Sequence, residues 1–213
     1  MIMKLRRATE ADSQFVAQAV LIATRAHLRK GWFDILLGDR KHECLPFIER
    51  LTCTAARSWW HYSRFWVAET QGTPAAALCC FKAGEGYPLS GEAFTEAAAG
   101  MNWDSDEQKR MWERGSYIFS CAVGGGDAVW TLENIATMPE YRRLGLTTML
   151  IEQAVAEGRQ EGCERMQVAT LIGNEPAIEA YKAFGFRLAE EKRSETFAAA
   201  MGSPGMCRFE IAL

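Results

Sequence analysis

The sequence predicts a mixed α/β protein in which one sheet is flanked by helices. About seven segments have the apolar patterning of strands, and segments with three- and four-residue apolar spacing, typical of helices, lie among them. The strands are too numerous for a simple β-α-β repeat, which favours a mixed sheet. A length of 213 residues suggests one domain over 1–213, large enough to bury its core without disulfides.

The first sixty residues are expected to form one strand and two helices. Residues 3–7 are the strand, and 8–10 lead into a helix with one apolar face. That face comprises Phe15, Ala19, Ile22, Ala23 and Ala26. A looser stretch with Trp32 follows and ends at Gly38, and a second helix is expected over about 41–52. Its buried positions are Leu45, Ile48 and Leu51.

A hairpin and a helical insertion follow. Segments 64–70 and 75–82 are two strands joined by a short turn containing Gly72 and Pro74. Residues of about 84–118 are rich in Gly, Ala and acidic side chains, with helices expected near 92–99 and 105–114. Asp104 and Glu107 have capping-box spacing, which favours a helix cap over a catalytic role. The run 124–127 lacks the spacing of a dinucleotide site and is expected to be a flexible turn.

The last third of the chain has the clearest pattern. A strand over 129–137 ends before Pro139, and Gly145 opens a long helix that reaches about Glu161. A strand over 165–171 comes next, then a helix over 176–184. The pair Gly185 and Phe186 begins another strand. A final strand contains Cys207 and has alternating apolar residues.

Composition excludes several functional classes. The net charge is −3 with no block of Lys or Arg, so a nucleic-acid partner is not expected. No apolar run approaches membrane-spanning length, and no secretion signal is recognised, so we expect a cytoplasmic protein without membrane association. The seven cysteines are scattered and odd in number, which favours free thiols. Without a C-x-x-C pair or neighbouring histidines, no metal site is predicted.

The segment from Thr137 to Thr147 predicts an anion site. A strand is followed by a loop with Arg142 and Arg143, and Gly145 allows a tight turn into the next helix. The first amides of a helix lack partners and lie at the positive end of its dipole, so they bind phosphate well. The alternative is an ordinary strand-to-helix turn with two solvated arginines.

Two motifs in this region resemble those of the GNAT superfamily of acyl-coenzyme A-dependent N-acyltransferases. The run PEYRRLGLTTMLIEQAV is similar to the family's (R/Q)-x-x-G-x-(G/A), and Asn174 to Phe186 are similar to its N-x-x-A-x-x-x-Y-x-x-x-G-F. The resemblance is strong over 129–188, weaker over 3–82 and absent from the insertion. It implies a mostly antiparallel sheet of about seven strands, with the fourth and fifth splayed apart and the insertion between the third and fourth.

The resemblance also implies acetyl-CoA as a co-substrate. The diphosphate is expected on the loop amides, and the pantetheine beside the end of the fourth strand. The implied cofactor-binding residues are Ile135, Ala136, Thr137, Arg142, Arg143, Leu144, Gly145, Leu146, Thr147, Asn174, Ala177 and Tyr181. Thr147 replaces the family's final Gly or Ala and crowds the diphosphate position, although its amide remains. Asn174 has the alternative role of a helix cap.

Glu133 and Tyr181 are the expected catalytic residues. A primary amine with a pKa of about 10.4 must lose a proton before it attacks, and Glu133 is the candidate base, directly or through water. Asn134 is a weaker candidate because alternation places it on the opposite face and an amide cannot accept a proton. The resemblance implies that Tyr181 protonates the leaving thiolate. The alternatives are a solvated or salt-bridged glutamate and a tyrosine that only packs in the core.

The implied function is transfer of acetyl from acetyl-CoA to a primary amine of a small molecule or peptide. One alternative is an acyl-CoA sensor without turnover, and another is a different nucleotide protein with a similar loop. Cys79, Cys80 and Cys121 are expected to be packing thiols rather than nucleophiles. Tryptophans and the acidic insertion would suit a cationic or aromatic amine. A homodimer is possible.

Overall fold

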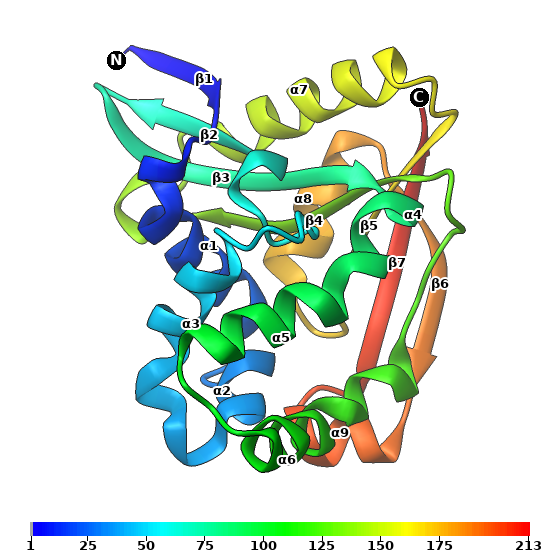
Figure 1. Cartoon of the computed structure of the whole chain (residues 1–213). Helices are drawn as coiled ribbons and strands as arrows, with labels where there is room; N and C mark the ends of the chain where they lie inside the picture. The colour runs from blue at the N-terminus through cyan, green and yellow to red at the C-terminus, as the bar shows by residue number, and fades with distance from the viewer. Residues whose placement is uncertain (1) are drawn as a thin grey trace.

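A computed structural model describes residues 2–213 as a seven-stranded sheet with helices on both faces (Figure 1). The sheet order is β1-β2-β3-β4-β5-β7-β6, and every neighbouring pair is antiparallel except β4 and β5. The strands are β1 (Met3–Arg7), β2 (Phe65–Thr70), β3 (Thr73–Lys82), β4 (Trp130–Thr137), β5 (Arg165–Leu171), β6 (Arg187–Arg193) and β7 (Gly205–Ala212). The predicted mixed sheet is therefore confirmed, strand by strand.

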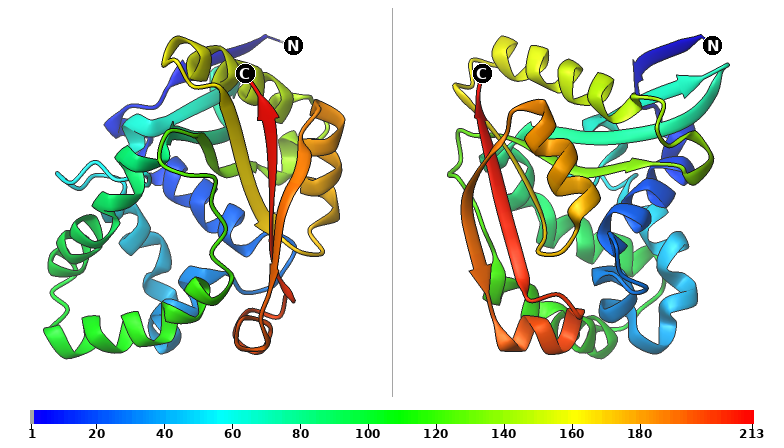
Figure 2. Two further views of the ribbon diagram at one scale, coloured as in Figure 1. Left: turned by 90° about the vertical axis from the view of Figure 1, so that its right-hand side faces the viewer. Right: turned by 180° about the vertical axis from the view of Figure 1, so that it is seen from behind.

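The helices divide between the two faces of the sheet (Figure 2). They are α1 (Ser13–Arg25), α2 (Trp32–Leu37), α3 (Cys44–Leu51), α4 (Ala83–Gly86), α5 (Ser90–Gly100), α6 (Ser105–Gly115), α7 (Leu146–Gln160), α8 (Glu175–Phe184) and α9 (Glu195–Met201). One apolar cluster joins α1, α2, α3 and α5 to β2 and β3, and a second joins α7 and α8 to the opposite face. Strand alternation produces this division, because Cys79 belongs to the first cluster and Cys80 to the second.

Several predictions about the N-terminal helices were wrong. The stretch containing Trp32 forms α2, which the sequence did not indicate. In α1 the fully buried residues include Val16 and Val20, whereas Ile22 and Ala23 are only partly buried. The buried face of α1 is rotated relative to the predicted one because the helix packs against both α3 and β4. The predicted burial of Leu45 is also wrong, since it is 39% exposed at the start of α3.

The insertion lies between β3 and β4, as predicted, and its two expected helices are α5 and α6, whereas the short α4 was not predicted. The Asp104 side chain accepts a hydrogen bond of 2.7 Å from the Glu107 amide, which confirms its role as the cap of α6. A 3₁₀ segment, Ser116–Cys121, then leads toward β4. The helix α9 between β6 and β7 was not predicted.

Within residues 2–213 all seven cysteine thiols are free, and Cys53 alone among them is exposed. The described residues bring together no His, Cys, Asp and Glu group suited to a metal ion. None of the helices described is both long enough and apolar enough to cross a membrane.

Candidate functional site

The fourth and fifth strands separate shortly after they meet. They pair in parallel only from Trp130 with Met166 to Leu132 with Val168, whereas β3 continues to pair with β4 as far as Thr137. From Glu133 onward, the edge of β4 that faces β5 therefore has no strand partner in residues 2–213. This is the predicted splay, and it leaves main-chain groups available to an extended ligand.

The backbone of β4 is irregular at the same point. Asn134 has a φ of 50°, in the left-handed region that few non-glycine residues adopt, and the register with β3 shifts beside it. Glu133 and Asn134 consequently line the same cavity. The expectation that alternation places Asn134 on the opposite face requires unbroken alternation, which the bulge interrupts: Leu132 and Ala136, an even number of residues apart, belong to opposite apolar clusters.

A cavity of about 1020 Å³ opens at the splay. It is lined on one side by the end of β4, the 142–147 loop, β5 and α8, and on the other by α1, α2, the insertion and α9. All of the predicted cofactor-binding residues line it except Leu144, which is half-buried in the same loop. The cavity is thus the one place where the predicted residues meet.

The start of α7 has the features of an anion site. Gly145 has a φ of 79° and Arg143 a φ of 64°, so the chain turns sharply before the helix. The first helical hydrogen bond runs from the Met149 amide to the Gly145 carbonyl at 3.1 Å. The amides of residues 145–148 have no acceptor elsewhere in 2–213. Four free donors at the positive end of a 15-residue helix are suited to bind an anionic group.

Two arginines accompany these amides. Arg142 and Arg143 are exposed and line the cavity, and neither has an ion-pair partner among residues 2–213. The Thr147 side chain turns toward the sheet, where its hydroxyl lies 3.2 Å from that of Thr137. The β-branched residue that departs from the family motif is therefore accommodated by a contact with β4, and its amide stays free.

Glu133 lies in the cavity and is held by a tyrosine of the insertion. The Tyr87 hydroxyl donates to Oε1 of Glu133 at 2.6 Å. Burial raises the pKa of Glu133 to about 7, although the hydrogen bond from Tyr87 lowers it. Glu133 has no cationic partner in the described structure and is only partly exposed, so the alternative of a solvated or salt-bridged residue does not hold.

Tyr87 itself was not predicted as a site residue. It is 38% exposed as a residue, yet its hydroxyl lies against Glu133, and burial and that carboxylate raise its pKa well above the usual value. It therefore acts as a hydrogen-bond donor at neutral pH. No local pattern marks it, because the contact joins residues 46 positions apart.

Tyr181 both packs in the core and lines the cavity. It is 6% exposed, and its ring centroid lies 6.1 Å from that of Phe186 and 6.2 Å from that of Phe209. Burial raises its pKa above the ordinary value, so it keeps its proton at neutral pH. No residue within 2–213 hydrogen-bonds to its hydroxyl, which leaves that proton available to a ligand.

Asn174 precedes α8 but its side chain does not cap the helix. Its Nδ2 donates to Oγ1 of Thr170 at 2.9 Å, and its main-chain carbonyl accepts from Ala177 and Ile178. The contact turns the Asn174 side chain toward β5 beside the cavity that it lines. The alternative of a side-chain helix cap is therefore wrong.

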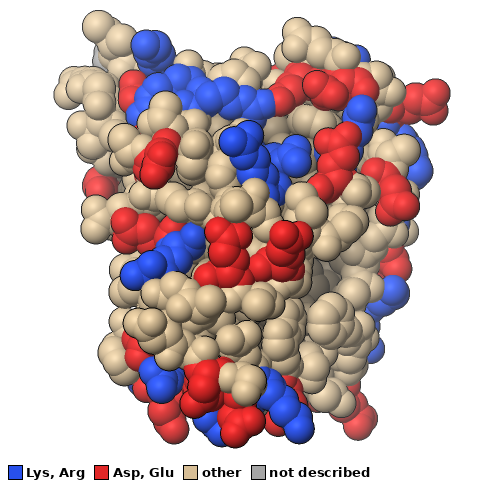
Figure 3. Space-filling view, viewed as in Figure 1, with Lys and Arg blue, Asp and Glu red and all other residues tan. Residues whose placement is uncertain are grey.

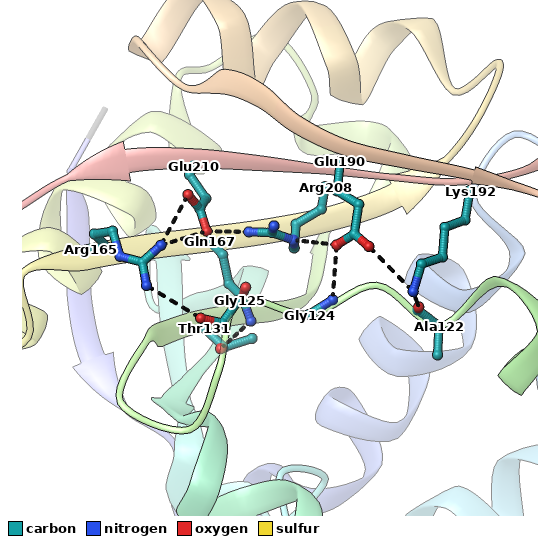
Figure 4. Close-up of polar contacts among 10 residues, drawn as sticks. All are labelled: Ala122, Gly124, Gly125, Thr131, Arg165, Gln167, Glu190, Lys192, Arg208 and Glu210. Carbon is teal, nitrogen blue, oxygen red and sulfur yellow. Dashed lines mark hydrogen bonds and ion pairs between the residues drawn. The ribbon is translucent and has the colours of Figure 1, made fainter.

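The far wall of the cavity is tied to the sheet by polar contacts (Figure 4). Lys192 donates to the Ala122 carbonyl at 2.6 Å, and the Gly124 amide donates to Glu190 at 3.3 Å. Arg208, which is 8% exposed, joins Glu190 to Glu210. The glycine run expected to be a flexible turn is thus anchored, and it positions the cavity-lining residues Phe119, Ala122 and Val123.

The acetyltransferase (GNAT) family model matches residues 37–186 of the chain. This span contains β2 to β5, the insertion, the 142–147 loop, α7 and α8.

Two mammalian enzymes are similar over part of the sequence. The chain is 34% identical over 71 residues to thialysine N-epsilon-acetyltransferase of Bos taurus, and equally to that of Mus musculus. Each match covers 33% of this chain and 41% of the relative. The chain therefore spans less than half the length of these curated relatives.

Solved structures resemble the whole fold. A crystal structure described as an acetyltransferase has a TM-score of 0.72 at 16% identity, over 98% of both chains. An N-acetyltransferase from Staphylococcus aureus Mu50 has a TM-score of 0.67 at 19% identity, over 98% of this chain and 100% of its own. The yncA protein of Salmonella typhimurium, solved with its cofactor acetyl-CoA, has a TM-score of 0.52 at 14% identity, over 99% of this chain and 94% of its own. These likenesses show a shared fold.

Proposed function

The chain belongs to the acetyltransferase (GNAT) family, and from this premise we propose that it transfers acetyl from acetyl-CoA to the primary amine of an acceptor. One observation carries the proposal. Free helix amides, an open strand edge and a buried carboxylate with a raised pKa all face a single cavity. The amine named in the mammalian relatives supports the acceptor class.

The start of α7 would hold the diphosphate of acetyl-CoA. Residues 145–148 offer four amides without partners in 2–213, and Arg142 and Arg143 add positive charge that no described side chain neutralises. Charge-assisted hydrogen bonds from main-chain amides bind phosphate oxygens strongly at a helix start. Because these donors are main-chain groups, the substitution at Thr147 does not remove any of them.

The open edge of β4 would hold the pantetheine and the thioester. Ile135, Ala136 and Thr137 present main-chain groups where β5 has separated, and Asn174 and Ala177 face them across the gap. A pantetheine that lies there pairs like an additional strand. An amide of this edge that points at the thioester carbonyl would stabilise negative charge on its oxygen during attack.

Glu133 would accept the proton of the amine. At a pKa of about 7 it is half ionised at neutral pH, and it is a stronger base than a glutamate with the ordinary pKa of about 4.3. Acetyl-CoA supplies the electrophilic carbonyl when bound. The amine nitrogen forms a bond to that carbon, the carbon–sulfur bond breaks, and the displaced proton passes to Glu133 directly or through one water.

Tyr181 would protonate the departing sulfur. Its hydroxyl keeps its proton at neutral pH and has no competing partner among the described residues, so it can donate a hydrogen bond to the sulfur as negative charge develops there. Because its pKa lies above the thiol value of about 8.5, the proton moves fully to the sulfur only as the tyrosine is reprotonated. The thiolate leaves with the electron pair of the broken bond, and the tyrosine regains its proton from solvent or from Glu133.

Calorimetry with acetyl-CoA and a thiol-release assay with primary amines test this function together. We expect binding of acetyl-CoA and amine-dependent appearance of free thiol. Binding without release for any amine would instead support the sensor without turnover. No binding would contradict the assignment of residues 145–148.

A further inference from the structure

The part of the cavity away from the α7 loop forms a chamber with aromatic walls. Trp32, Trp59, Trp60, Tyr87 and Trp112 line it, and Ile22 of α1 completes the wall. Figure 1 shows α2 and α6, which carry two of these residues, on the opposite side of β4 from α7. We call this part the acceptor chamber.

The aromatic rings contact one another in a continuous series, which begins with the tyrosine that holds Glu133. Tyr87 donates to Glu133, and its ring centroid lies 5.6 Å from that of Trp59. Trp59 lies 4.3 Å from Trp60, which stacks on Trp32 at 6.2 Å with an interplanar angle of 7°. A molecule whose amine reaches Glu133 would therefore place the rest of its body against indole and phenol faces.

The cavity offers little to a second cationic group. Among the described residues that line the cavity, Glu133 is the sole carboxylate. The acidic residues of the insertion are engaged elsewhere: Glu96 accepts from the Ala55 amide at 2.7 Å, and Glu107 accepts from Arg110 at 2.8 Å. Figure 3 shows acidic side chains on the outer surface over α5 and α6. The expectation that the insertion adds carboxylates to the acceptor site is thus wrong.

This distribution discriminates between classes of amine. A second ammonium would lose its hydration against the apolar walls without a second carboxylate to pair with, which is costly. A ring or alkyl body would bury apolar surface, and a single ammonium would gain from both Glu133 and the aromatic faces.

From these contacts we infer that the acceptor is a monoamine with an aromatic or other bulky apolar body, and not a polyamine. The inference rests on the proposed function and specifies its acceptor.

The test compares 2-phenylethylamine with 1,4-diaminobutane. Thiol release from acetyl-CoA measures turnover of each amine, and calorimetry on protein saturated with coenzyme A measures binding. We expect kcat/KM to favour 2-phenylethylamine by about 10²-fold, the scale on which apolar pockets discriminate.

Two variants test whether the acceptor chamber causes the preference for 2-phenylethylamine. Trp112 is half-buried, lines the chamber and packs on Phe94 at 4.8 Å, so Trp112→Ala should reduce the kcat/KM ratio about 10-fold. Trp66 is also half-buried, but it donates to Glu157 on the other face and does not line the cavity. Trp66→Ala should leave the ratio unchanged. A ratio of two substrates on one preparation does not depend on the fraction of folded protein.

Each outcome decides one of the two hypotheses. Equal use of both amines, or preference for 1,4-diaminobutane, overturns the inference and leaves the acetyltransferase in place. Preferential binding of 2-phenylethylamine without thiol release supports the chamber and refutes the activity. If neither amine binds, the inference is overturned.

Discussion

Replacing Tyr87 with phenylalanine tests the electrostatics of Glu133 most directly. The change removes the hydroxyl that donates to Oε1 at 2.6 Å and retains the ring that faces Trp59. Burial raises the pKa of Glu133 to about 7 and this hydrogen bond lowers it, so its loss raises the pKa further. Since the base acts only when unprotonated, the acid limb of kcat/KM moves to higher pH.

The size of the shift follows from the hydrogen bond. A bond to a charged group contributes about 1.5–3 kcal/mol, and each pKa unit corresponds to about 1.36 kcal/mol. Tyr87 is 38% exposed, so water can replace part of the lost bond. We therefore expect a shift of about one unit, with activity about 10-fold below wild type on the acid limb and equal to wild type at high pH.

Initial rates of thiol release across pH, with two amines of different pKa, measure this shift. A limb of the pH profile that shifts when the amine is changed reports the pKa of the amine. A limb that stays in place for both amines reports a group of the protein. Tyr62→Phe is the matched control, because Tyr62 is a partly buried tyrosine outside the cavity. An unmoved limb in Tyr87→Phe, or a shift to lower pH, would refute the role assigned to this contact.

Four further substitutions, two of them paired with a control substitution, have defined outcomes. Glu133→Gln should lower kcat about 10²-fold with acetyl-CoA affinity unchanged by calorimetry, and near-normal turnover would remove it as the base. Tyr181→Phe should slow turnover about 10-fold at neutral pH, and equal rates at all pH values would exclude it as the acid. Gly145→Ala adds a β-carbon to a residue with a φ of 79°, which costs about 1–2 kcal/mol and should weaken acetyl-CoA binding about 10-fold. Its control, Gly72→Ala, has a similar φ of 81° in the β2–β3 turn and should leave acetyl-CoA binding unchanged. Gly125→Ala would place a Cβ 2.6 Å from Oε1 of Gln167, whereas Gly124→Ala meets nothing within 4 Å. Only the former should lower the melting temperature and raise KM for the amine.

The sequence predicted those parts of the molecule that depend on local pattern. Alternation in β7, the hairpin turn at Gly72 and the glycine before α7 each act over a few residues, and each was confirmed. The residues proposed to hold acetyl-CoA could be brought together from the sequence for the same reason, since the end of β4 and the start of α7 are neighbours in the chain.

The parts that were missed depend on distant contacts. The short helix α2 has no periodicity long enough to identify it, and it is stabilised partly by the ion pair of Asp34 with Arg25 at 2.7 Å. The bulge at Asn134 reverses the orientation that simple alternation assigns. Tyr87 reaches Glu133 only because the insertion folds back over β4.

The division of the cavity between main-chain donors and side-chain walls has a consequence for the evolution of the protein. Apart from Gly145, whose left-handed φ restricts the residue type, mutation cannot delete an amide at 145–148 short of introducing proline, so the proposed recognition of the thioester carrier would tolerate wide sequence change. The aromatic walls have no such protection, and single replacements there would alter which amine fits. Divergent copies of this gene would therefore be expected to keep one chemistry while they acquire new acceptors.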